Sequence, residues 1–402
     1  MVNILVECPA LIASVRVGVL NSLRTLGDIS KAVRFRETLK IKRTDIEWAD
    51  IVICVRGCEP ASRVIMESVK KFGRLLIYFL DDDLLNVPDG LSCSDYFNRE
   101  SIRGSMLDIL KNADILWYVN PLIGESYDQY TTARLVLTKI PAEIKASAPD
   151  IHNGDKIRVL YAGSVDHQRL ADELIIPAAK LLEQWQPGRF SFCFVGAVPS
   201  EKGLPFEECH DFFNNYDEYC DFISNGGFSI GLAPVLTSRF YQCKYINKFI
   251  EYTRMGITGI YTDSLPYTMV VADNTTGYLT DNTPESWANA ILRAADAPKE
   301  TQCCWQRAVA LLEHDFSAQR LADELREKLP ELLTFHAPEI HISPFAMPPL
   351  RVAFFAERCS YFWKKDPLTA PFMIAAKLFK AFFREIIKGG KTLAKKVFSR
   401  DL

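Results

Sequence analysis

The chain has 402 residues, of which 48% are apolar and 24% charged, so it has the composition of a soluble globular protein and the length of two domains plus an extension. Its eleven cysteines are scattered without a CxxC pair and follow no signal peptide, which argues against a disulfide-stabilised secreted protein and predicts a cytoplasmic one. The net charge of −3 hides an asymmetry, because residues 345–402 carry a net charge of +8 and the remaining residues −11.

Short apolar runs alternate with helical patterns through the first half of the chain. The runs are rich in Val, Ile, Leu and aromatic residues and do not alternate with polar residues, as in parallel strands that are covered on both faces. They span residues 3–6, 50–55, 75–80, 114–119 and 134–140. Helices are predicted between them, for example over 61–72 and 121–130. This order predicts a doubly wound α/β sheet, and residues 1–147 are assigned to a first Rossmann-like domain.

A polar, turn-rich segment at 147–155 predicts a linker, after which the α/β alternation restarts. Strands are expected at 156–163, 189–196, 228–235 and 257–262, and helices at 170–185 and 284–298. Thr283 is the expected N-cap of the last of these helices, with Pro284 in its first turn. Two further helices reach about Leu333, so residues 156–333 form the second predicted domain, again Rossmann-like.

Residues 334–402 follow as a linker rich in Pro and His and a basic tail. In the tail, apolar residues recur every seven positions at Phe372, Phe379, Ile386 and Leu393, with lysines and arginines between them and an interruption at Gly389–Gly390. This pattern predicts a basic amphipathic helix. It could pack on the body, lie on an anionic membrane surface or bind nucleic acid. The Lys-rich, aromatic face favours the membrane, and no nucleic-acid-reading motif is present. No stretch reaches the roughly 18 apolar residues of a membrane-spanning helix.

Two strands of the second half end in glycine, and an open α/β sheet binds its ligands outside the carboxyl ends of its strands. Gly163 and Ser164 come at the end of the strand 156–163, and His167 lies three residues farther on. The glycine would let a ligand approach the backbone, and free amides at the next helix start attract phosphate. The pattern is not GxGxxG, so no nicotinamide cofactor is expected. A tight turn for Gly163 and a solvated loop position for His167 are the alternatives.

The segment KYINKFIEYTRMGI, residues 244–257, combines two lysines and a glutamate with aromatic residues. As one helix, it would place Lys244, Lys248 and Glu251 close to the same face, with aromatic side chains on a neighbouring stripe. This fits an ordinary surface Lys–Glu pair worth about 0.3–0.5 kcal/mol. It fits equally well a helix start at the interdomain crevice, where two ammonium groups hold a diphosphate and the carboxylate accepts ribose hydroxyls.

The stretch CKYINKFIEYTRMGITGIYTDSLPY resembles the motif in which a Lys-rich loop leads into K-F-x-E-Y-x-x-x-G-I in GT-B glycosyltransferases of the family 4 type. Further segments resemble the same family in the same order along the chain. They are ADIVICVRG and LLIYFLDDDLLNVP in the first domain, and IRVLYAGSVDHQRLADELIIPAAKLL, with its G-S-x-x-H turn, and TTGYLTDNTPESWANAI in the second. The resemblance covers roughly residues 45–300.

The resemblance implies two facing Rossmann-like domains (GT-B) with the active site between them. The acceptor would lie on the first domain and the nucleotide-sugar mainly on the second. It further implies a retaining transfer of the hexosyltransferase type that needs no metal and no cofactor, since the nucleotide-sugar is a substrate. In one respect the chain departs from the family. Many members carry a second glutamate eight residues before the first, where this chain has Cys243, so a role for that position cannot be carried over.

The resemblance also implies roles for single residues. Glu251 would hold the ribose of the donor, while Lys244 and Lys248 would act on its diphosphate. The opposite wall of the donor site would be formed by Gly163, Ser164 and His167. Further candidate donor contacts on the helix of Glu251 are Asn247, Phe249 and Tyr252.

Three consecutive carboxylates, Asp81, Asp82 and Asp83, follow the strand predicted at 75–80 and therefore lie at the rim of the crevice. Such residues can bind Mg²⁺ together with waters, although the resemblance implies no metal. Contact with the substrate or the acceptor is one further interpretation. Helix capping combined with solvation is the other.

These observations predict a cytoplasmic glycosyltransferase, peripheral at the inner face of the cell membrane. It would move a sugar from a nucleotide-sugar to a lipid-linked or polysaccharide acceptor in bacterial surface glycan synthesis, with no nucleic-acid partner. Two alternatives stay open. One is a non-catalytic GT-B-fold subunit of a glycan-assembly complex, which Cys243 favours. The other is a GT-B-fold sugar-nucleotide epimerase, which would need no acceptor.

Overall fold

The computed structural model describes residues 1–27, 32–142, 156–213, 215–342, 350–365 and 367–375. The linker predicted at 147–155 and the amphipathic pattern beyond residue 375 lie outside these described residues. The α/β class and the two Rossmann-like domains are confirmed, because the described residues contain two separate sheets, each of six strands, and every strand pair is parallel.

The first sheet belongs to the N-terminal domain and has the strand order β2-β1-β3-β4-β5-β6. Its strands are β1 (Ile4–Cys8), β2 (Val33–Glu37), β3 (Ile51–Val55), β4 (Leu75–Leu80), β5 (Ile115–Tyr118) and β6 (Arg134–Leu137). One face is covered by α2 (Arg43–Trp48), α3 (Pro60–Lys71), α5 (Glu100–Asn112) and α6 (Pro121–Tyr127). The helical segment Ser14–Leu20 and α1 (Asn21–Arg24) cover the other face, so the central strands are buried on both sides.

The second sheet has the order β12-β11-β10-β7-β8-β9. Its strands are β7 (Ile157–Ala162), β8 (Phe190–Val195), β9 (Glu207–His210), β10 (Ile230–Ala233), β11 (Thr258–Thr262) and β12 (Tyr278–Thr280). The helices α8 (Ile176–Trp185) and α12 (Pro284–Asp296) pack on one face. On the other face lie α9 (Tyr216–Asn225) and α11 (Asn247–Arg254). The N-cap predicted for α12 is present, because the side chain of Thr283 accepts a hydrogen bond from the amide of Ser286.

Three strands are absent from the sequence-based prediction, and all three lie at sheet edges. β2 alternates between half-buried and exposed residues, β9 contains two glutamates and a histidine, and β12 has only three residues. An edge strand pairs on one side only and is often short or charged. These segments therefore lack the continuous apolar run that marks a central strand.

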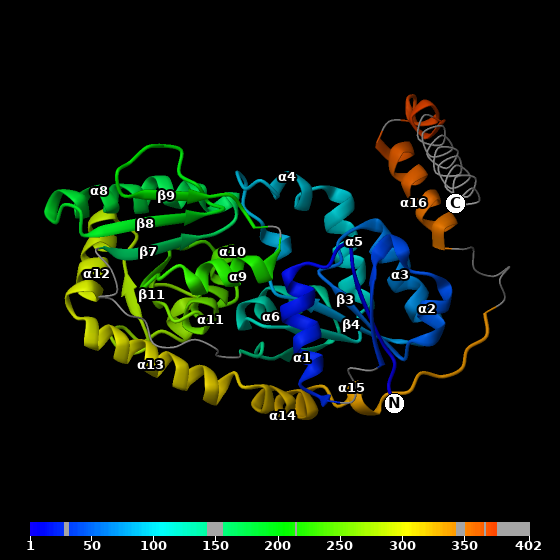
Figure 1. Ribbon diagram of the computed structural model, residues 1–402. Helices are drawn as coiled ribbons and strands as arrows, with labels where there is room; N and C mark the ends of the chain where they lie inside the picture. Colours follow the sequence, from blue (N-terminus) through cyan, green and yellow to red (C-terminus); the bar gives the residue numbers. More distant parts are fainter. Residues whose placement is uncertain (28–31, 143–155, 214, 343–349, 366, 376–402) are drawn as a thin grey trace, which may run out of the picture.

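The end of the second predicted domain differs from the structure. After α13 (Pro298–Asp315) the chain returns to the N-terminal domain, where α14 (Ala318–Lys328) and α15 (Glu331–Thr334) pack (Figure 1). The guanidinium of Arg134 on β6 donates to the carbonyl of Lys328 and to Glu331, at 2.6 Å each, and Nζ of Lys328 donates to the carbonyl of Leu137 at 2.8 Å. Leucines of α14 and α15 join an apolar cluster that contains residues of both domains, and the hydrogen bonds above tie these helices to β6, so the end of the range 156–333 also contacts the first domain.

The described part of the C-terminal extension follows the surface of the N-terminal domain. The amide of Ala337 donates to Oδ1 of Asp50 at 3.0 Å, and the Arg74 guanidinium donates to the carbonyl of Pro338 at 3.3 Å. The helix α16 (Leu350–Lys365) then lies against α3 and projects from the body (Figure 1). Among the described helices, none is both long enough and apolar enough to cross a bilayer.

Candidate functional site

The carboxyl ends of the two sheets face each other across the domain interface. On the N-terminal side, Arg56 follows β3, Asp81–Asp83 follow β4 and Asn120 follows β5. On the other side, Gly163 follows β7, and the segment from α10 (Arg239–Gln242) into α11 follows β10. Ligands of open α/β sheets bind outside the carboxyl ends of the strands. The interdomain cleft is therefore the candidate site.

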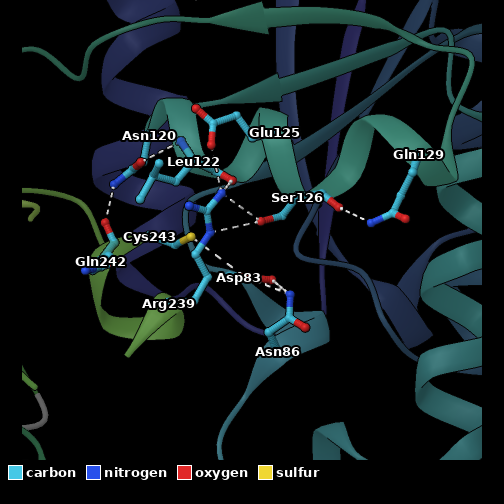
Figure 2. Close-up of polar contacts among 10 residues, drawn as sticks. All are labelled: Asp83, Asn86, Asn120, Leu122, Glu125, Ser126, Gln129, Arg239, Gln242 and Cys243. Carbon is cyan, nitrogen blue, oxygen red and sulfur yellow. Dashed lines mark hydrogen bonds and ion pairs between the residues drawn. The ribbon is translucent and has the colours of Figure 1, made fainter. Parts of the chain in front are cut away.

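Lys244 lies outside the helix on which the sequence placed it, because α11 begins only at Asn247. Asn120 is the physical reason. Its Nδ2 donates to the carbonyl of Gln242 at 2.9 Å (Figure 2) and to the carbonyl of Lys244 at 2.8 Å. A helix running through Lys244 would use these two carbonyls for its own i to i+4 hydrogen bonds. The expectation that Lys244, Lys248 and Glu251 share one helical face is thus wrong for Lys244, although both lysines still reach the cleft.

Lys248 and Glu251 do lie on one face of α11 and form an ion pair of 2.6 Å. The hydroxyl of Tyr219, on α9, accepts from Nζ of Lys248 at 3.3 Å and donates to Glu251 at 3.4 Å. The side chains of Lys248 and Glu251 are only 24% and 17% exposed. Burial opposes the charge on Lys248, but the Glu251 carboxylate holds the pKa of this lysine above its usual value. Lys248 is therefore held as an ammonium, and the half-buried pair is more strongly fixed than an exposed surface pair.

His167, which follows β7, lies near enough to both lysines for their charges to act on it. Burial first, and then the charges of Lys244 and Lys248, lower the pKa of His167 to about 4, so its imidazole is neutral near pH 7. A Cβ on Gly163 would lie 2.9 Å from Cβ of His167, so only glycine leaves the histidine room here. Ser164 is exposed at the start of the short helical turn Val165–His167. The structure thus brings the two lysines, each with its carboxylate partner, and the turn after β7 (residues 163–167, the β7 turn) to the same part of the cleft.

The other donor candidates of α11 have two kinds of environment. Asn247 is exposed at the first residue of the helix. Phe249 and Tyr252 are fully buried in the core, and the hydroxyl of Tyr252 donates to the carbonyl of Leu232 on β10 at 2.8 Å. These two aromatic residues hold α11 on the sheet, so we do not carry them into the proposed donor site.

Asp81 and Asp82 both face the guanidinium of Arg56, whose Nη1 is 3.5 Å and 3.0 Å from their carboxylates. Arg56 has a left-handed backbone with φ of 53°, an unusual conformation for a residue with a side chain. Burial raises the pKa of Asp82, but Lys244 and Arg56 outweigh it and hold this pKa below its usual value. Burial raises the pKa of Asp81. Asp81 and Asp82 thus already face protein cations.

Asp83 has a structural role. It is fully buried, and both of its carboxylate oxygens accept from Nδ2 of Asn86 at 2.9 Å (Figure 2). Across the interface, Sγ of Cys243 donates to the same carboxylate at 3.7 Å. Asp83 precedes the helical turn Leu84–Asn86, but its side chain makes no capping hydrogen bond there and is not solvated, so capping combined with solvation does not describe it. The side chain of Asp82 is partly exposed in the cleft.

One group among the described residues has the ligand types of a metal site: atoms of Cys193, Glu208 and His210 lie within 4.8 Å of one another on β8 and β9. Nε2 of His210 is 2.6 Å from Glu208. The guanidinium of Arg158 also donates to Glu208, so this carboxylate is already paired with a cation. An arginine in that place opposes the binding of a metal cation, and we assign no metal to the group.

Sequence reasoning missed three residues of the site. Arg56 and Asn120 were not singled out, although each follows directly or almost directly on the end of a predicted strand, which was a usable signal. Tyr219 comes from α9, a helix that the prediction did not contain. Its contact with Lys248 and Glu251 joins residues about thirty positions apart and has no local signature.

A cavity of 590 Å³ adjoins this site at the domain interface. The N-terminal domain lines it around Asn120 and Leu137–Lys139, and the C-terminal domain lines it around Lys244–Ile246 and Thr268–Ala272. A further part of the wall is formed by the end of α13 and by α14, with Asp315, Phe316 and Glu324. Apolar side chains predominate, with Lys139, Lys244 and Lys328 as the cationic members of the lining. The cavity is of the size of a small-molecule site.

No protein-family model matches the chain, and no curated protein matches its sequence. Solved structures with the same fold are similar to it. HepE from Anabaena, in complex with UDP and glucose, matches with a TM-score of 0.59 and 11% identity over 82% of this chain and 100% of HepE. Sucrose-phosphate synthase from Thermosynechococcus elongatus matches with a TM-score of 0.59 and 13% identity, over 82% of this chain and 99% of the synthase.

A UDP-forming α,α-trehalose-phosphate synthase from Burkholderia xenovorans is also similar. Its TM-score is 0.53 with 9% identity, and the match covers 83% of this chain and 100% of the synthase. At such identities the likeness concerns the fold. The chain has the GT-B fold, with two facing Rossmann-like domains.

Proposed function

We propose that this protein is a glycosyltransferase that moves a sugar from a nucleoside-diphosphate donor to an acceptor hydroxyl. The observation that carries the proposal is the convergence of Lys244, Lys248 and Glu251 with the β7 turn in the cleft of a GT-B fold. When the bond between sugar and phosphate breaks, negative charge develops on the departing diphosphate. Fixed ammonium groups in a partly desolvated cleft stabilise that charge more strongly than water does.

Each part of the donor has its own proposed place in the cleft. The diphosphate lies between Lys244 and Lys248, near the start of α11, whose helix dipole favours anions. The neutral imidazole of His167 and the glycine turn at Gly163 form the facing wall. Glu251 accepts the ribose hydroxyls while it keeps Lys248 in place. The lysines supply the positive charge, so the proposed reaction uses neither a metal nor an organic cofactor.

The comparisons support a nucleotide-sugar as the donor class. HepE was solved with UDP-glucose, and the trehalose-phosphate synthase is named as UDP-forming. The sequence resemblance to the family 4 type adds the expectation of a retaining hexosyl transfer. We therefore propose UDP-sugars as the first donors to test.

The acceptor is proposed to enter the 590 Å³ cavity beside Lys244. Its lining is mainly apolar, which suits an acceptor with an apolar part. Of its three lysines, Lys139 and Lys328 pair with Asp315 and Glu324, so Lys244 is the one proposed to meet an anionic part of the acceptor. A lipid-linked sugar has this character, and a polysaccharide end is the other acceptor class considered. Surface glycan synthesis in bacteria is the proposed context.

The described part of the C-terminal extension supports the proposed membrane contact. On α16, Val352, Phe355 and Trp363 are 52%, 41% and 56% exposed, at spacings that place them on one side of the helix. Leu368 and Phe372 are also exposed. Exposed aromatic and aliphatic side chains on a segment with a net charge of +8 suit an anionic lipid surface. We propose that residues 345–402 hold the enzyme, from the cytoplasm, at the inner face of the cell membrane.

Replacing Trp363 and Phe372 together by serine is expected to weaken binding to phosphatidylglycerol vesicles by at least tenfold. Each side chain contributes roughly 1.5–3 kcal/mol when it leaves water. Co-sedimentation with the vesicles measures the effect. Trp185→Ser is the matched control, because Trp185 is 45% exposed but lies at the end of α8, in the other domain. Equal binding of the double variant and the wild type would contradict the membrane proposal.

The test of the function is a thermal-shift series with UDP, GDP and ADP and their common sugar conjugates. A ligand at a hundred times its Kd adds about 2.7 kcal/mol to the stability of the folded state. We expect a rise of Tm with the UDP compounds for the wild type and none for Glu251→Ala. The absence of a shift with every nucleotide would refute the proposed donor site.

Cys243 favours the non-catalytic alternative, because it occupies the position of the family's other glutamate and is fully buried, with Sγ turned to Asp83. Product analysis separates the alternatives. Incubation with donor and an acceptor mixture yields a glycosylated acceptor if the protein is a transferase. An epimer formed from the donor alone would instead identify an epimerase, and binding without any product would identify a non-catalytic subunit.

A further inference from the structure

The two lysines of the cleft are held in different ways. Lys248 has a carboxylate from its own helix at 2.6 Å. Among the described residues, the ion pair of Lys244 is longer, with its Nζ 3.6 Å from Oδ1 of Asp82, and this carboxylate belongs to the other domain. A direct charge-assisted hydrogen bond is about 2.7–2.9 Å long. The Lys244 ammonium also lies over the rings of Phe240, at 4.7 Å, and Tyr241, at 6.0 Å. Lys244 is therefore the more easily displaced of the two.

Asp82 does not depend on Lys244 alone. Its other oxygen, Oδ2, is 3.0 Å from the guanidinium of Arg56. The side chain is 18% exposed, and that of Lys244 is 28% exposed, so both reach solvent in the cleft. If Lys244 turned away, Asp82 would still face Arg56, which it shares with Asp81, whereas Lys244 would need a new anion. Removing one partner from a pair is costly only when the other charge is left buried and alone.

The backbone beside Lys244 is clamped, so a change of partner involves only the side chain. Asn120 binds the carbonyls on both sides of Cys243, and Cys243 itself contacts Asp83. One helical turn earlier, the Arg239 guanidinium donates to Glu125 at 3.0 Å and to the carbonyl of Leu122 at 3.1 Å (Figure 2). A lysine side chain has four rotatable bonds and can pivot on such a fixed base.

We propose that the Lys244–Asp82 ion pair is a contact that the donor breaks: the diphosphate takes Lys244 from Asp82, and Asp82 is thereby freed to accept a hydrogen bond from the acceptor hydroxyl. The inference rests on the proposed function, and it adds an order of binding and a positioning role for Asp82. Before the donor arrives, Asp82 is engaged by two cations. After it arrives, one oxygen of Asp82 faces the cleft on the acceptor side.

The exchange predicts that Asp82 competes with the donor for Lys244. Asp82→Asn removes the competing charge and keeps the shape of the side chain. We expect this variant to bind UDP about threefold to tenfold more tightly than the wild type, measured by titration calorimetry, since a partly exposed ion pair is worth on the order of 1 kcal/mol. The same variant is expected to have a higher KM for the acceptor. A merely structural role would not tighten UDP binding.

Two controls define the result. Glu125→Gln removes another ion pair between the domains, with Arg239, and is expected to leave the Kd for UDP unchanged. In a Lys244→Met background, which itself binds UDP more weakly, Asp82→Asn is expected to have no further effect. Asp82→Ala serves as a second variant if Asp82→Asn does not fold.

The outcomes separate the two proposals. Equal UDP affinity of the wild type and Asp82→Asn overturns the exchange and leaves the glycosyltransferase proposal standing. Equal tightening by Glu125→Gln also overturns it, because looser domain contact would then be the cause. A wild type that binds no nucleotide at all overturns the proposed function and this inference with it.

Discussion

The variant Lys248→Met is expected to bind a nucleoside diphosphate about a hundredfold more weakly than the wild type and to lose transferase activity by a similar factor or more. In the structure this ammonium is fixed between Glu251, at 2.6 Å, and the hydroxyl of Tyr219, at 3.3 Å. Removing one fixed donor that stabilises a developing anion costs roughly a factor of 10²–10³ in catalysis. Titration with UDP and a radiolabelled transfer assay measure the two effects.

Loss of Lys248 also leaves Glu251 without its cation, so a folding defect has to be separated from a binding defect. The double variant Lys248→Met/Glu251→Gln removes both charges and is expected to regain stability but not nucleotide binding. Lys180→Met is the matched control, because Lys180 on α8 likewise pairs with a glutamate, Glu201, at 2.7 Å, but far from the cleft. Normal UDP binding by Lys248→Met would remove this lysine from the proposed site.

Gly231→Ala is expected to lower the free energy of unfolding by about 1–3 kcal/mol, the usual cost of overpacking a core. Gly231 lies in β10, and a Cβ there would be 2.7 Å from the ring of Tyr252 on α11. That ring is fully buried, and its hydroxyl is bonded to Leu232, so it has no free direction in which to yield. Displacing Tyr252 moves the helix that carries Lys248 and Glu251. Thermal or urea unfolding measures the stability, and the thermal shift with UDP measures the site.

The matched control for this variant is Gly104→Ala, in the middle of α5. A Cβ at Gly104 has open space around it, and alanine favours a helix by about 1 kcal/mol over glycine. We therefore expect Gly104→Ala to be neutral or slightly stabilising. A Gly231→Ala variant as stable as Gly104→Ala would show that the contact between Tyr252 and β10 does not position α11 as described.

The central strands and their order in two domains follow from local composition. Runs such as LLIYFL and RFSFCFV are apolar on both faces because parallel strands are covered on both sides, and this signal needs no tertiary information. Edge strands β2, β9 and β12 escape such reasoning, since an edge is polar or short for reasons of solubility. The return of α14 to the first domain could not be predicted in this way either, because an apolar stripe on a helix does not indicate which sheet it packs on.

The candidate site was predictable where it depends on position along a strand. Gly163, His167 and the aspartates after β4 were found because they follow apolar runs, and Lys248 and Glu251 because they share a helical face. Phe249 and Tyr252 were included among the donor candidates because an aromatic residue beside a site looks the same in sequence whether it faces a ligand or the core. Only their burial decides between the two.

The sequence by itself determined two Rossmann-like domains, because buried parallel strands are continuous apolar runs separated by helical segments. It also determined the Lys–Glu pair of α11, because residues three apart share one face of a helix. Tertiary structure alone decided where that helix begins, because Asn120 takes carbonyls that lie more than 120 positions farther along the chain. Tertiary structure also decided that Asp83 accepts a hydrogen bond from Cys243 and that Asp82 forms an ion pair with Lys244. These contacts depend on how the two domains pack against each other, and a sequence pattern within one domain does not indicate them.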